Sequence, residues 1–234
     1  MTFSRWRAAG NEYLLVERAE LGSPLTSERV LAEVGGSDGI LEVVAVTGDE
    51  AEIVIWNPDG STAELSGNGT RIVARWLAER IGADDVTVRV GARTVTARMR
   101  PDGDVEQNVG RFEVYEPERV AGLRVTAVSV GNPHAVVVGD PDDLPLIGPL
   151  LETHPRFPER TNVQVARIDG PGAVTARVWE RGVGETRSSG TSAVAVAAAT
   201  HGTGEVVVSF PGGDLTVWLE GGSARLIGPV ERVE

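Results

Sequence analysis

The sequence predicts an α+β fold made of two similar β-rich lobes, each wrapped around one central helix. Short segments rich in β-branched residues, separated by Gly or Asp, fill most of both halves. Each half also holds one helix-like run that follows a serine. The segments ahead of these runs match in spacing, because Asn57 precedes Ser66 by nine residues and Glu180 precedes Ser189 by nine. We expect an N-terminal lobe at 1–116, completed by a C-terminal strand at 224–234, and a second lobe at 117–223.

The first half of the chain combines strand patterns with two helix patterns. The predicted strands lie at 41–46, 51–56, 86–90 and 94–99. The predicted helices lie at 27–34 and 68–81, and each ends at a glycine. The apolar stripe of the second helix consists of Ile72, Val73, Trp76, Leu77 and Ile81. We expect Arg71, which is not part of this stripe, to be solvated.

The second half repeats this organisation. Strand patterns at 124–130, 135–139, 162–168 and 173–179 precede a small-residue helix at 190–200, and three more strands follow at 205–210, 214–219 and 224–227. The helix is apolar nearly all round, which predicts that it is buried inside a curved sheet. The boundary between the halves is expected near residues 113–123.

Composition limits the classes of function. The chain has 234 residues, 41% of them hydrophobic, which is enough for a sizeable core. Its 34 acidic and 22 basic residues give a formal charge of −12, which opposes binding to nucleic acid or anionic lipid. No apolar run approaches the roughly 20 residues of a membrane span, and the first residues lack the pattern of a signal peptide. We therefore expect a cytoplasmic protein with no nucleic-acid or membrane partner.

Several kinds of site are not expected. The sequence contains no cysteine, which excludes disulfides, thiolate metal sites and thiol nucleophiles. Its three histidines, His134, His154 and His201, share no metal-ligand spacing, so we expect no metal site. The glycines at 35–39 lack the Lys-Ser/Thr ending of a phosphate loop, so nucleotide binding is not expected either.

The two serines stand where the central helices begin. Ser66-Gly67-Asn68 and Ser189-Gly190-Thr191 each place a hydroxyl beside helix N–H groups that are available to an anion. Taken alone, either serine is more readily explained as a helix cap. The matched spacing instead favours one anion site at which the two halves face each other.

Other polar residues have both a functional and a structural reading. In the GNPH segment, Asn132 could offer its amide to a ligand, although a strand-to-strand turn explains the segment equally well. His134 is more readily a packed or capping residue than a general base. Arg181 suits a substrate carboxylate, and a surface ion pair with Glu180 is the alternative. The remaining acidic candidates are read as solvated turn residues: Asp59, Glu64 and Glu185.

Five segments, in this order, resemble the diaminopimelate epimerase family. They are AAGNEYLLVE with Asn11; NPDGSTAELSGNGTR with Asn57, Gly67 and Asn68; VSVGNPHAVVV with Asn132; FPERTNVQVARI with Asn162; and ERGVGETRSSGTSA with Glu180, Arg181, Gly190 and Thr191. The resemblance spans nearly the whole chain. It implies a two-lobed pseudo-symmetric fold that holds an amino acid between the lobes, with the α-carboxylate at the two helix N-termini. It also implies no metal or pyridoxal cofactor, and it leaves a homodimer open.

The chain departs from the family at both reactive positions. The family uses two cysteines on opposite faces of Cα, and Ser66 and Ser189 stand in their places. A serine hydroxyl ionises several pH units above a thiol, so we expect substrate binding to survive better than turnover. The sequence leaves open whether the serines are natural or engineered. Gly39 stands where some members place a polar substrate contact, which leaves the fine specificity open.

The leading hypothesis is a diaminopimelate epimerase or close homologue in lysine and peptidoglycan precursor synthesis. One alternative is a related racemase, epimerase or dehydratase acting on another amino acid, with hydroxyproline-type substrates the first to test. A second alternative is a catalytically silent amino-acid-binding protein.

Overall fold

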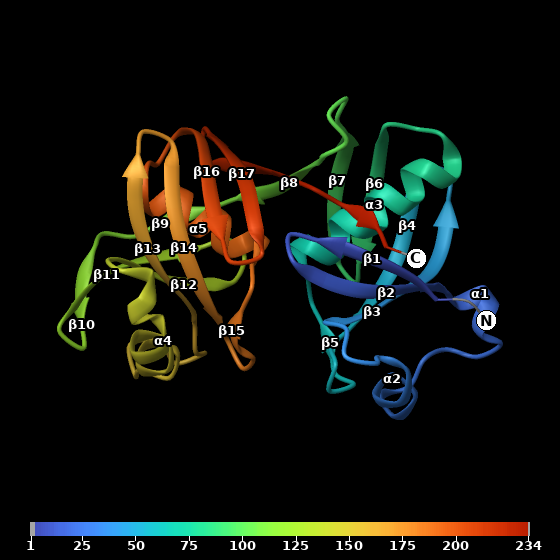
Figure 1. Cartoon of the computed structure of the whole chain (residues 1–234), viewed down its shortest axis with the longest axis horizontal. Coiled ribbons are helices and arrows are strands. Elements are labelled where there is room, and N and C mark those ends of the chain that lie inside the picture. The colour runs from blue at the N-terminus through green and yellow to red at the C-terminus, as the bar shows by residue number, and fades with distance from the viewer. Residues whose placement is uncertain (1–2, 234) are drawn as a thin grey trace. The chain divides into compact units, whose positions relative to one another are not determined.

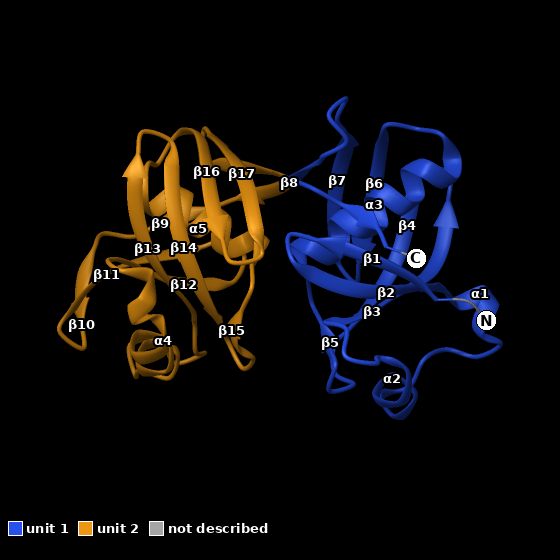
Figure 2. Ribbon diagram, viewed as in Figure 1, with its two compact units in different colours: residues 1–108, 228–234 blue, residues 109–227 orange. Residues whose placement is uncertain are grey.

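The computed structural model describes residues 3–233, which form two compact units (Figures 1 and 2). Unit 1 comprises the described part of residues 1–108 and 228–234, and unit 2 comprises residues 109–227. Each unit is rich in strands and contains a few helices, so the predicted α+β class is confirmed. The units divide after residue 108, and residues 113 and 114 pair with a strand of unit 2.

Unit 1 is a mixed sheet whose strands follow the spatial order β19-β1-β2-β3-β4-β6-β7-β8. The β2–β3 and β4–β6 pairs are parallel, and the other pairs are antiparallel. Its strands are β1 (Ser4–Ala8), β2 (Asn11–Glu17), β3 (Gly39–Thr47), β4 (Glu50–Trp56), β5 (Thr62–Ala63), β6 (Asp85–Val90), β7 (Arg93–Met99), β8 (Val105–Arg111) and β19 (Glu231–Arg232). Its helices are α1 (Arg18–Leu21), α2 (Ser27–Glu33) and α3 (Gly67–Ile81).

Unit 2 repeats this topology in the order β11-β12-β13-β14-β16-β17-β18, with β12–β13 and β14–β16 as the parallel pairs. Its strands are β9 (Glu113–Val114), β10 (Glu118–Val120), β11 (Leu123–Ser129), β12 (Pro133–Val138), β13 (Asn162–Gly170), β14 (Ala173–Glu180), β15 (Gly184–Thr186), β16 (Gly204–Phe210), β17 (Gly213–Glu220) and β18 (Ser223–Gly228). Its helices are the 3₁₀ turn η1 (Pro141–Asp143), α4 (Leu144–Glu152) and α5 (Gly190–Thr200).

The repeat extends to strand register. In unit 1, Ile40 of β3 lies opposite Trp56 of β4, and in unit 2 Val163 of β13 lies opposite Trp179 of β14. Each of these ladders contains one irregularity in register. A short strand then extends each ladder, β5 beside β4 and β15 beside β14, and leads into the central helix. The same local path therefore delivers the chain to the N-termini of α3 and α5.

Each central helix is buried by its own sheet (Figure 1). α3 packs against strands of unit 1, and its apolar face joins a core that includes Leu41, Ile53 and Ile55. α5 packs against strands of unit 2, and residues 192–198 are all buried, as its composition predicted. The sheet residues that surround these helices are largely Val, Ile and Leu, whose burial supplies most of the favourable free energy of folding.

In each unit, the indole of one tryptophan donates a hydrogen bond to a buried carboxylate. Trp56 donates from its indole Nε1 to Glu42 Oε2 at 3.0 Å, and Trp179 donates to Glu152 Oε2 at 2.7 Å. In unit 2, α4 approaches Trp179 through Gly148, where an added Cβ would lie 2.8 Å from the ring. The tryptophans are equivalent in the repeat, but Glu42 lies on β3 whereas Glu152 ends α4.

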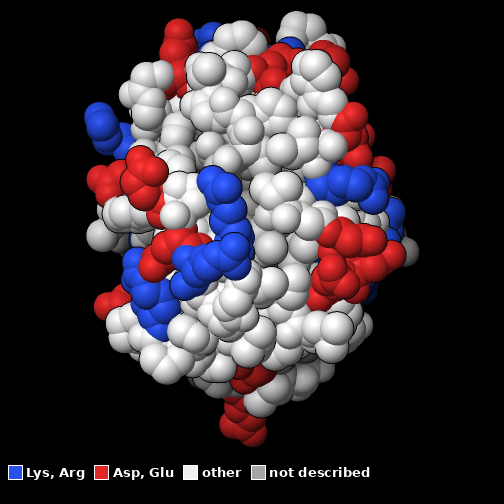
Figure 3. Space-filling view, turned by 90° about the vertical axis from the view of Figure 1, so that its left-hand side faces the viewer, with Lys and Arg blue, Asp and Glu red and all other residues white. Residues whose placement is uncertain are grey.

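Charged side chains are interspersed on the face shown in Figure 3, with uncharged surface between them. All 22 basic residues of the chain are arginines. Within residues 3–233, no helix is long and apolar enough to span a membrane. The same part of the chain contains no group of three or more His, Asp or Glu side chains suited to a metal ion.

Candidate functional site

Each unit carries one group of predicted site residues, here called its half-site, and the half-site of unit 1 lies at the N-terminus of α3. Ser66 occupies the N-cap position in an extended conformation, and its Oγ accepts a hydrogen bond from Gly69 N–H at 3.0 Å. The hydroxyl of Tyr13 lies 3.2 Å from the same Oγ. Gly67 and Asn68 form the first turn of the helix. Ser66 thus caps the helix, and its Oγ also shares a hydrogen bond with the Tyr13 hydroxyl.

Ser189 holds the equivalent position at the N-terminus of α5 but makes different contacts. Its backbone is extended, with φ −150° and ψ 129°, and its carbonyl accepts from Ala193 N–H at 2.9 Å. Its side chain makes no capping hydrogen bond and is buried. Gly190 and Thr191 open the helix. The hydroxyl of Ser189 is therefore not used to cap α5.

Behind Ser66, three buried polar side chains form a chain of hydrogen bonds. Arg71 NH2 donates to Asn68 Oδ1 at 2.6 Å, and Asn68 Nδ2 donates to Asn11 Oδ1. Arg71 is fully buried, so the expectation that it is solvated was wrong. Burial lowers the pKa of Arg71 to about 10, which leaves the guanidinium charged at neutral pH. The sequence patterns missed this residue as part of the site.

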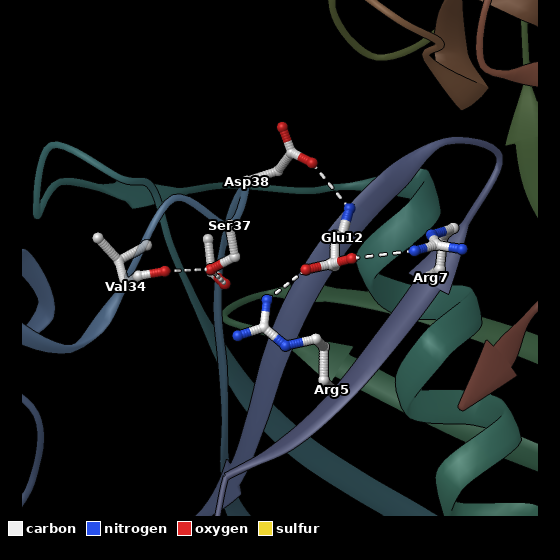
Figure 4. A network of polar contacts seen from close by, with 7 residues as sticks. Arg5, Arg7, Glu12, Val34, Ser37 and Asp38 are labelled. Carbon is white, nitrogen blue, oxygen red and sulfur yellow. Dashed lines mark hydrogen bonds and ion pairs between the residues drawn. The ribbon is translucent and has the colours of Figure 1, made fainter. Parts of the chain in front are cut away.

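The backbone beside Asn11 is fixed by the network in Figure 4. Glu12 N–H donates to Asp38 Oδ2 at 2.7 Å, and Asp38 N–H donates to Glu12 O at 2.7 Å. The Glu12 carboxylate in turn forms ion pairs with Arg5 and Arg7. These arginines hold the pKa of Glu12 below its usual value, with Arg5 contributing most. The network joins the loop before β3 to the start of β2, where Asn11 lies.

Gly39 lies at this junction and has no room for a side chain. Its φ is +154°, and a Cβ at this position would lie 2.3 Å from Trp56 O and 3.0 Å from Tyr13 Cε1. The Tyr13 ring occupies the space beside Gly39, and its hydroxyl reaches Ser66. A polar side chain at position 39 is therefore sterically excluded unless the backbone and Tyr13 move. Tyr13 was missed because the sequence patterns predicted no strand at 11–17 and gave this position no role.

Asn57 lies in the turn that follows β4. Its N–H donates to Ser61 O at 2.8 Å, its Nδ2 donates to Ser61 Oγ at 2.9 Å, and its carbonyl accepts from Gly60 N–H at 3.0 Å. Gly60 has φ +81°, and a Cβ there would lie 2.9 Å from Ser27 O. These bonds place Asn57 at a fixed position in the turn.

In unit 2, the GNPH segment positions an amide through a buried histidine. His134 Nε2 lies 2.9 Å from Asn132 Oδ1, and its Nδ1 lies 3.1 Å from Gln164 Nε2. Gln164 Nε2 also donates to Ser192 Oγ in the first turn of α5. Burial lowers the pKa of His134 to about 3, and the charge of Arg181 also lowers it. Neutral His134 is placed to orient the Asn132 amide.

Glu180 and Arg181 lie in a turn in which the N–H groups of residues 181, 182 and 183 each donate a hydrogen bond. Asn162 Oδ1 accepts from Arg181 N–H at 3.0 Å while its Nδ2 donates to Pro133 O at 2.9 Å, so it links this turn to β12. Val183 N–H donates to Glu180 O at 3.0 Å. Glu180 Oε1 accepts from Thr186 Oγ1 at 2.6 Å. The guanidinium of Arg181 is exposed and donates to Glu159 O at 3.2 Å.

A buried carboxylate supplies the remaining contact to this turn. Glu152 Oε1 accepts from Gly182 N–H at 2.7 Å and pairs with Arg160, while Oε2 accepts from Trp179 Nε1. Burial acts to raise the pKa of Glu152, but these donors outweigh it and hold the pKa below its usual value. Glu152 was missed because it ends a helix that the sequence patterns did not reveal.

Comparison with known proteins matches both halves of the chain. The diaminopimelate epimerase family model matches residues 7–114 and 126–233. The diaminopimelate epimerase of Synechococcus elongatus is 34% identical over 269 residues, covering 100% of this chain and 96% of the relative. That of Pelotomaculum thermopropionicum is 36% identical over 275 residues, covering 100% and 97%. The aligned spans exceed the 234 residues of this chain, so the alignments contain gaps in it.

Solved structures share the fold. A predicted epimerase from Pseudomonas aeruginosa superposes with a TM-score of 0.74 at 16% identity, covering 99% of this chain and 96% of that one. A hydroxyproline epimerase from Agrobacterium vitis, with bound trans-4-hydroxy-L-proline, superposes with a TM-score of 0.70 at 17% identity, covering 98% and 88%.

Proposed function

Because this chain belongs to the diaminopimelate epimerase family, we propose that it binds diaminopimelate and inverts one Cα, with Ser66 and Ser189 as the acid–base pair. The observation that carries this proposal is the repeated placement of a serine at the N-terminus of the central helix in each unit. The proposed setting is the cytoplasmic synthesis of lysine and peptidoglycan precursors.

The proposed chemistry moves one proton in and one proton out. The alkoxide of one serine takes the proton from Cα and becomes a hydroxyl, leaving the electron pair delocalised into the carboxylate. The hydroxyl of the other serine returns a proton to the opposite face and becomes an alkoxide. The N–H groups of the first turns and the dipoles of α3 and α5 favour the negative charge that develops on the carboxylate. A proton exchange with solvent then resets the two serines.

The contacts of the two serines support unequal roles. A hydrogen bond from Gly69 N–H favours negative charge on Ser66 Oγ, and the Tyr13 hydroxyl, 3.2 Å away, is positioned to donate a second one, so this oxygen is the better proton acceptor. The Ser189 hydroxyl is not engaged in capping and retains its hydrogen for donation. A serine is nevertheless a far weaker base than a thiolate at neutral pH. We therefore propose slow turnover.

Amino-acid racemisation without pyridoxal phosphate is consistent with the composition of the chain. Pyridoxal enzymes hold their cofactor through a Schiff base to a lysine amine. The 22 basic residues of this sequence are all arginines, so it supplies no such amine. The proposed proton transfers need only the side chains and helix N-termini described above.

The test is exchange of the α-proton of diaminopimelate in heavy water, followed by NMR. The protein should bind diaminopimelate and exchange the α-proton slowly, and the double variant Ser66→Cys, Ser189→Cys should exchange it orders of magnitude faster because a thiol ionises more readily. Binding with no exchange by either protein would support a silent amino-acid-binding protein. No binding of diaminopimelate would overturn the proposed substrate.

A further inference from the structure

Arg71 is a fully buried cation with few partners. Its NH2 donates to Asn68, whereas its Nε and NH1 have no hydrogen-bond acceptor among the described residues. Asp104 acts on it through charge alone, without an ion pair. Burying a charge without an ion pair opposes folding. The position is therefore poorly explained by stability.

The residue of unit 2 that is equivalent to Arg71 shows which kind of side chain packing alone requires at this position. Aligning Ser66 with Ser189 places Arg71 opposite Val194, which is fully buried in α5. An apolar side chain thus fits this position of a central helix. Unit 1 carries a cation where unit 2 carries a hydrocarbon, which points to a function in the half-site of unit 1.

The hydrogen bonds of Arg71 fix the direction of two amides. A guanidinium only donates, so Asn68 must turn its Oδ1 toward Arg71. Its Nδ2 then faces Asn11 and donates to Asn11 Oδ1. The donor end of the Asn11 amide is thereby set on the side away from Asn68. An anion such as a carboxylate is recognised by donors, so this direction matters for binding.

The comparable series of hydrogen bonds in unit 2 does not begin at a residue that can only donate. It runs through Gln164, His134 and Asn132, and both Gln and neutral His contain a donor and an acceptor. That chain can reverse its direction by exchanging donors and acceptors along its length. The chain in unit 1 cannot reverse, because it begins at a residue that has no acceptor.

We propose that Arg71 is a positioning residue that orients the Asn68 and Asn11 amides so that the half-site of unit 1 presents donors to a substrate carboxylate. This inference rests on the proposed function for the identity of the ligand. According to this proposal, Arg71 determines whether donors or acceptors of the two amides face the ligand. The positive charge of Arg71 also adds to the anion-attracting potential at the N-terminus of α3.

Two variants test the proposal, with a control on the same helix. Arg71→Met removes the charge and the donors at similar size, whereas Arg71→Gln keeps a polar contact but allows the amides to reverse. Both should weaken diaminopimelate binding by about tenfold or more in calorimetry, and Arg71→Met should melt no lower than the parent protein. Arg75→Met, one turn further along α3 at an exposed ion pair with Glu79, should bind as the parent does.

A second measurement does not depend on the ligand. The side-chain amide NMR signals of Asn11 and Asn68 should shift or double in both Arg71 variants and remain unchanged in the Arg75 variant. Unchanged amide signals, or unchanged affinity in a folded Arg71 variant, would overturn the role of Arg71. If the parent protein binds no diaminopimelate, the proposed substrate fails, and the amide signals still decide whether Arg71 sets their orientation.

Discussion

At the scale of single residues, the same residue type makes different contacts in the two half-sites. Ser66 accepts the capping hydrogen bond of α3, while the Ser189 side chain makes no capping bond in α5. The sequence could place both serines before a helix, because each precedes Gly and then a periodic run. It could not show which hydroxyl is engaged, since that depends on side-chain rotation and on Tyr13, a neighbour from a distant strand.

Arg71 shows why another residue prediction failed. A helix that packs on one face leaves residues outside its apolar stripe in water. α3 is instead enclosed by its own sheet, which buries Arg71 although it lies outside the stripe. The burial of position 71 could have been inferred from the repeat, because the equivalent residue in the second half is the apolar Val194.

His134 leads to a prediction about stability and pH. Its folded-state pKa is lowered by burial to about 3, from an ordinary value of 6.5. Between these values the unfolded chain binds a proton at His134 that the folded protein does not. The stability that comes from keeping His134 neutral is therefore fully present above pH 6.5 and is lost as the pH falls toward 3. The loss attributable to His134 should reach at most about 1.4 kcal/mol per pH unit.

The variant His134→Gln should remove this contribution. Gln can still accept from Gln164 and donate to Asn132, and it does not titrate. Denaturant unfolding of the parent and the variant, from pH 7 to pH 4, gives the unfolding free energy of each protein. The titration of the carboxylates affects both proteins equally and cancels in the difference between these two free energies. A difference that stays constant over this range would mean that His134 takes up its proton at the same pH in the folded and the unfolded protein.

At the scale of elements, the helices differ in how well the sequence predicted them. The helix expected at 68–81 is observed at Gly67–Ile81, and that expected at 190–200 at Gly190–Thr200. A serine precedes each helix, and both helical runs are long enough to be recognised in the sequence. α4 was missed because Pro145 and Pro149 interrupt its sequence, and proline normally argues against a helix interior. Missing α4 also concealed Glu152.

The buried carboxylates Glu152 and Glu42 allow a matched comparison. Glu152 holds Gly182 in the turn that carries Glu180 and Arg181. Glu42 instead accepts from Leu25 N–H at 3.2 Å and pairs with Arg18, and neither of these partners is a predicted site residue. Its donors likewise hold its pKa below the usual value against the effect of burial. Changing either residue to Gln leaves a buried donor without its acceptor, which costs about 1–3 kcal/mol.

We therefore expect similar losses of stability but different effects on binding. Glu152→Gln should weaken diaminopimelate affinity by about tenfold, because the turn that positions Arg181 loses an anchor. Glu42→Gln should leave the affinity of the folded protein unchanged. Denaturant unfolding and calorimetry measure the two quantities on the same samples. Equal affinity losses in the two variants would show that Glu152 acts only through stability.

At the scale of the whole molecule, the sequence predicted the two similar halves but not which strands pair in parallel within each sheet. The shared nine-residue spacing and the alternating strands were sufficient to expect two β-rich lobes around helices. They could not reveal that β2–β3 and β4–β6 are parallel, or that β12–β13 and β14–β16 repeat this. Parallel pairing joins strands separated by long crossovers, so no local turn signal specifies it.

The proposed function makes a demand on the molecule as a whole, namely that the two serines act on opposite faces of one Cα. A single thiol can remove and return a proton on one face only. Ser66→Cys and Ser189→Cys should therefore each accelerate deuterium exchange with retention of configuration, one from the LL isomer and the other from the meso isomer. Only the double variant should interconvert the isomers rapidly, because it supplies a thiol for each face.

NMR of the α-proton with a chiral separation of the products distinguishes these outcomes. Each single variant is compared with the parent on both isomers, and the double variant serves as the reference for full inversion. If both single variants accelerated exchange from the same isomer, the two positions would not flank one Cα. The repeat would then supply two similar helix N-termini without the two-faced chemistry proposed for them.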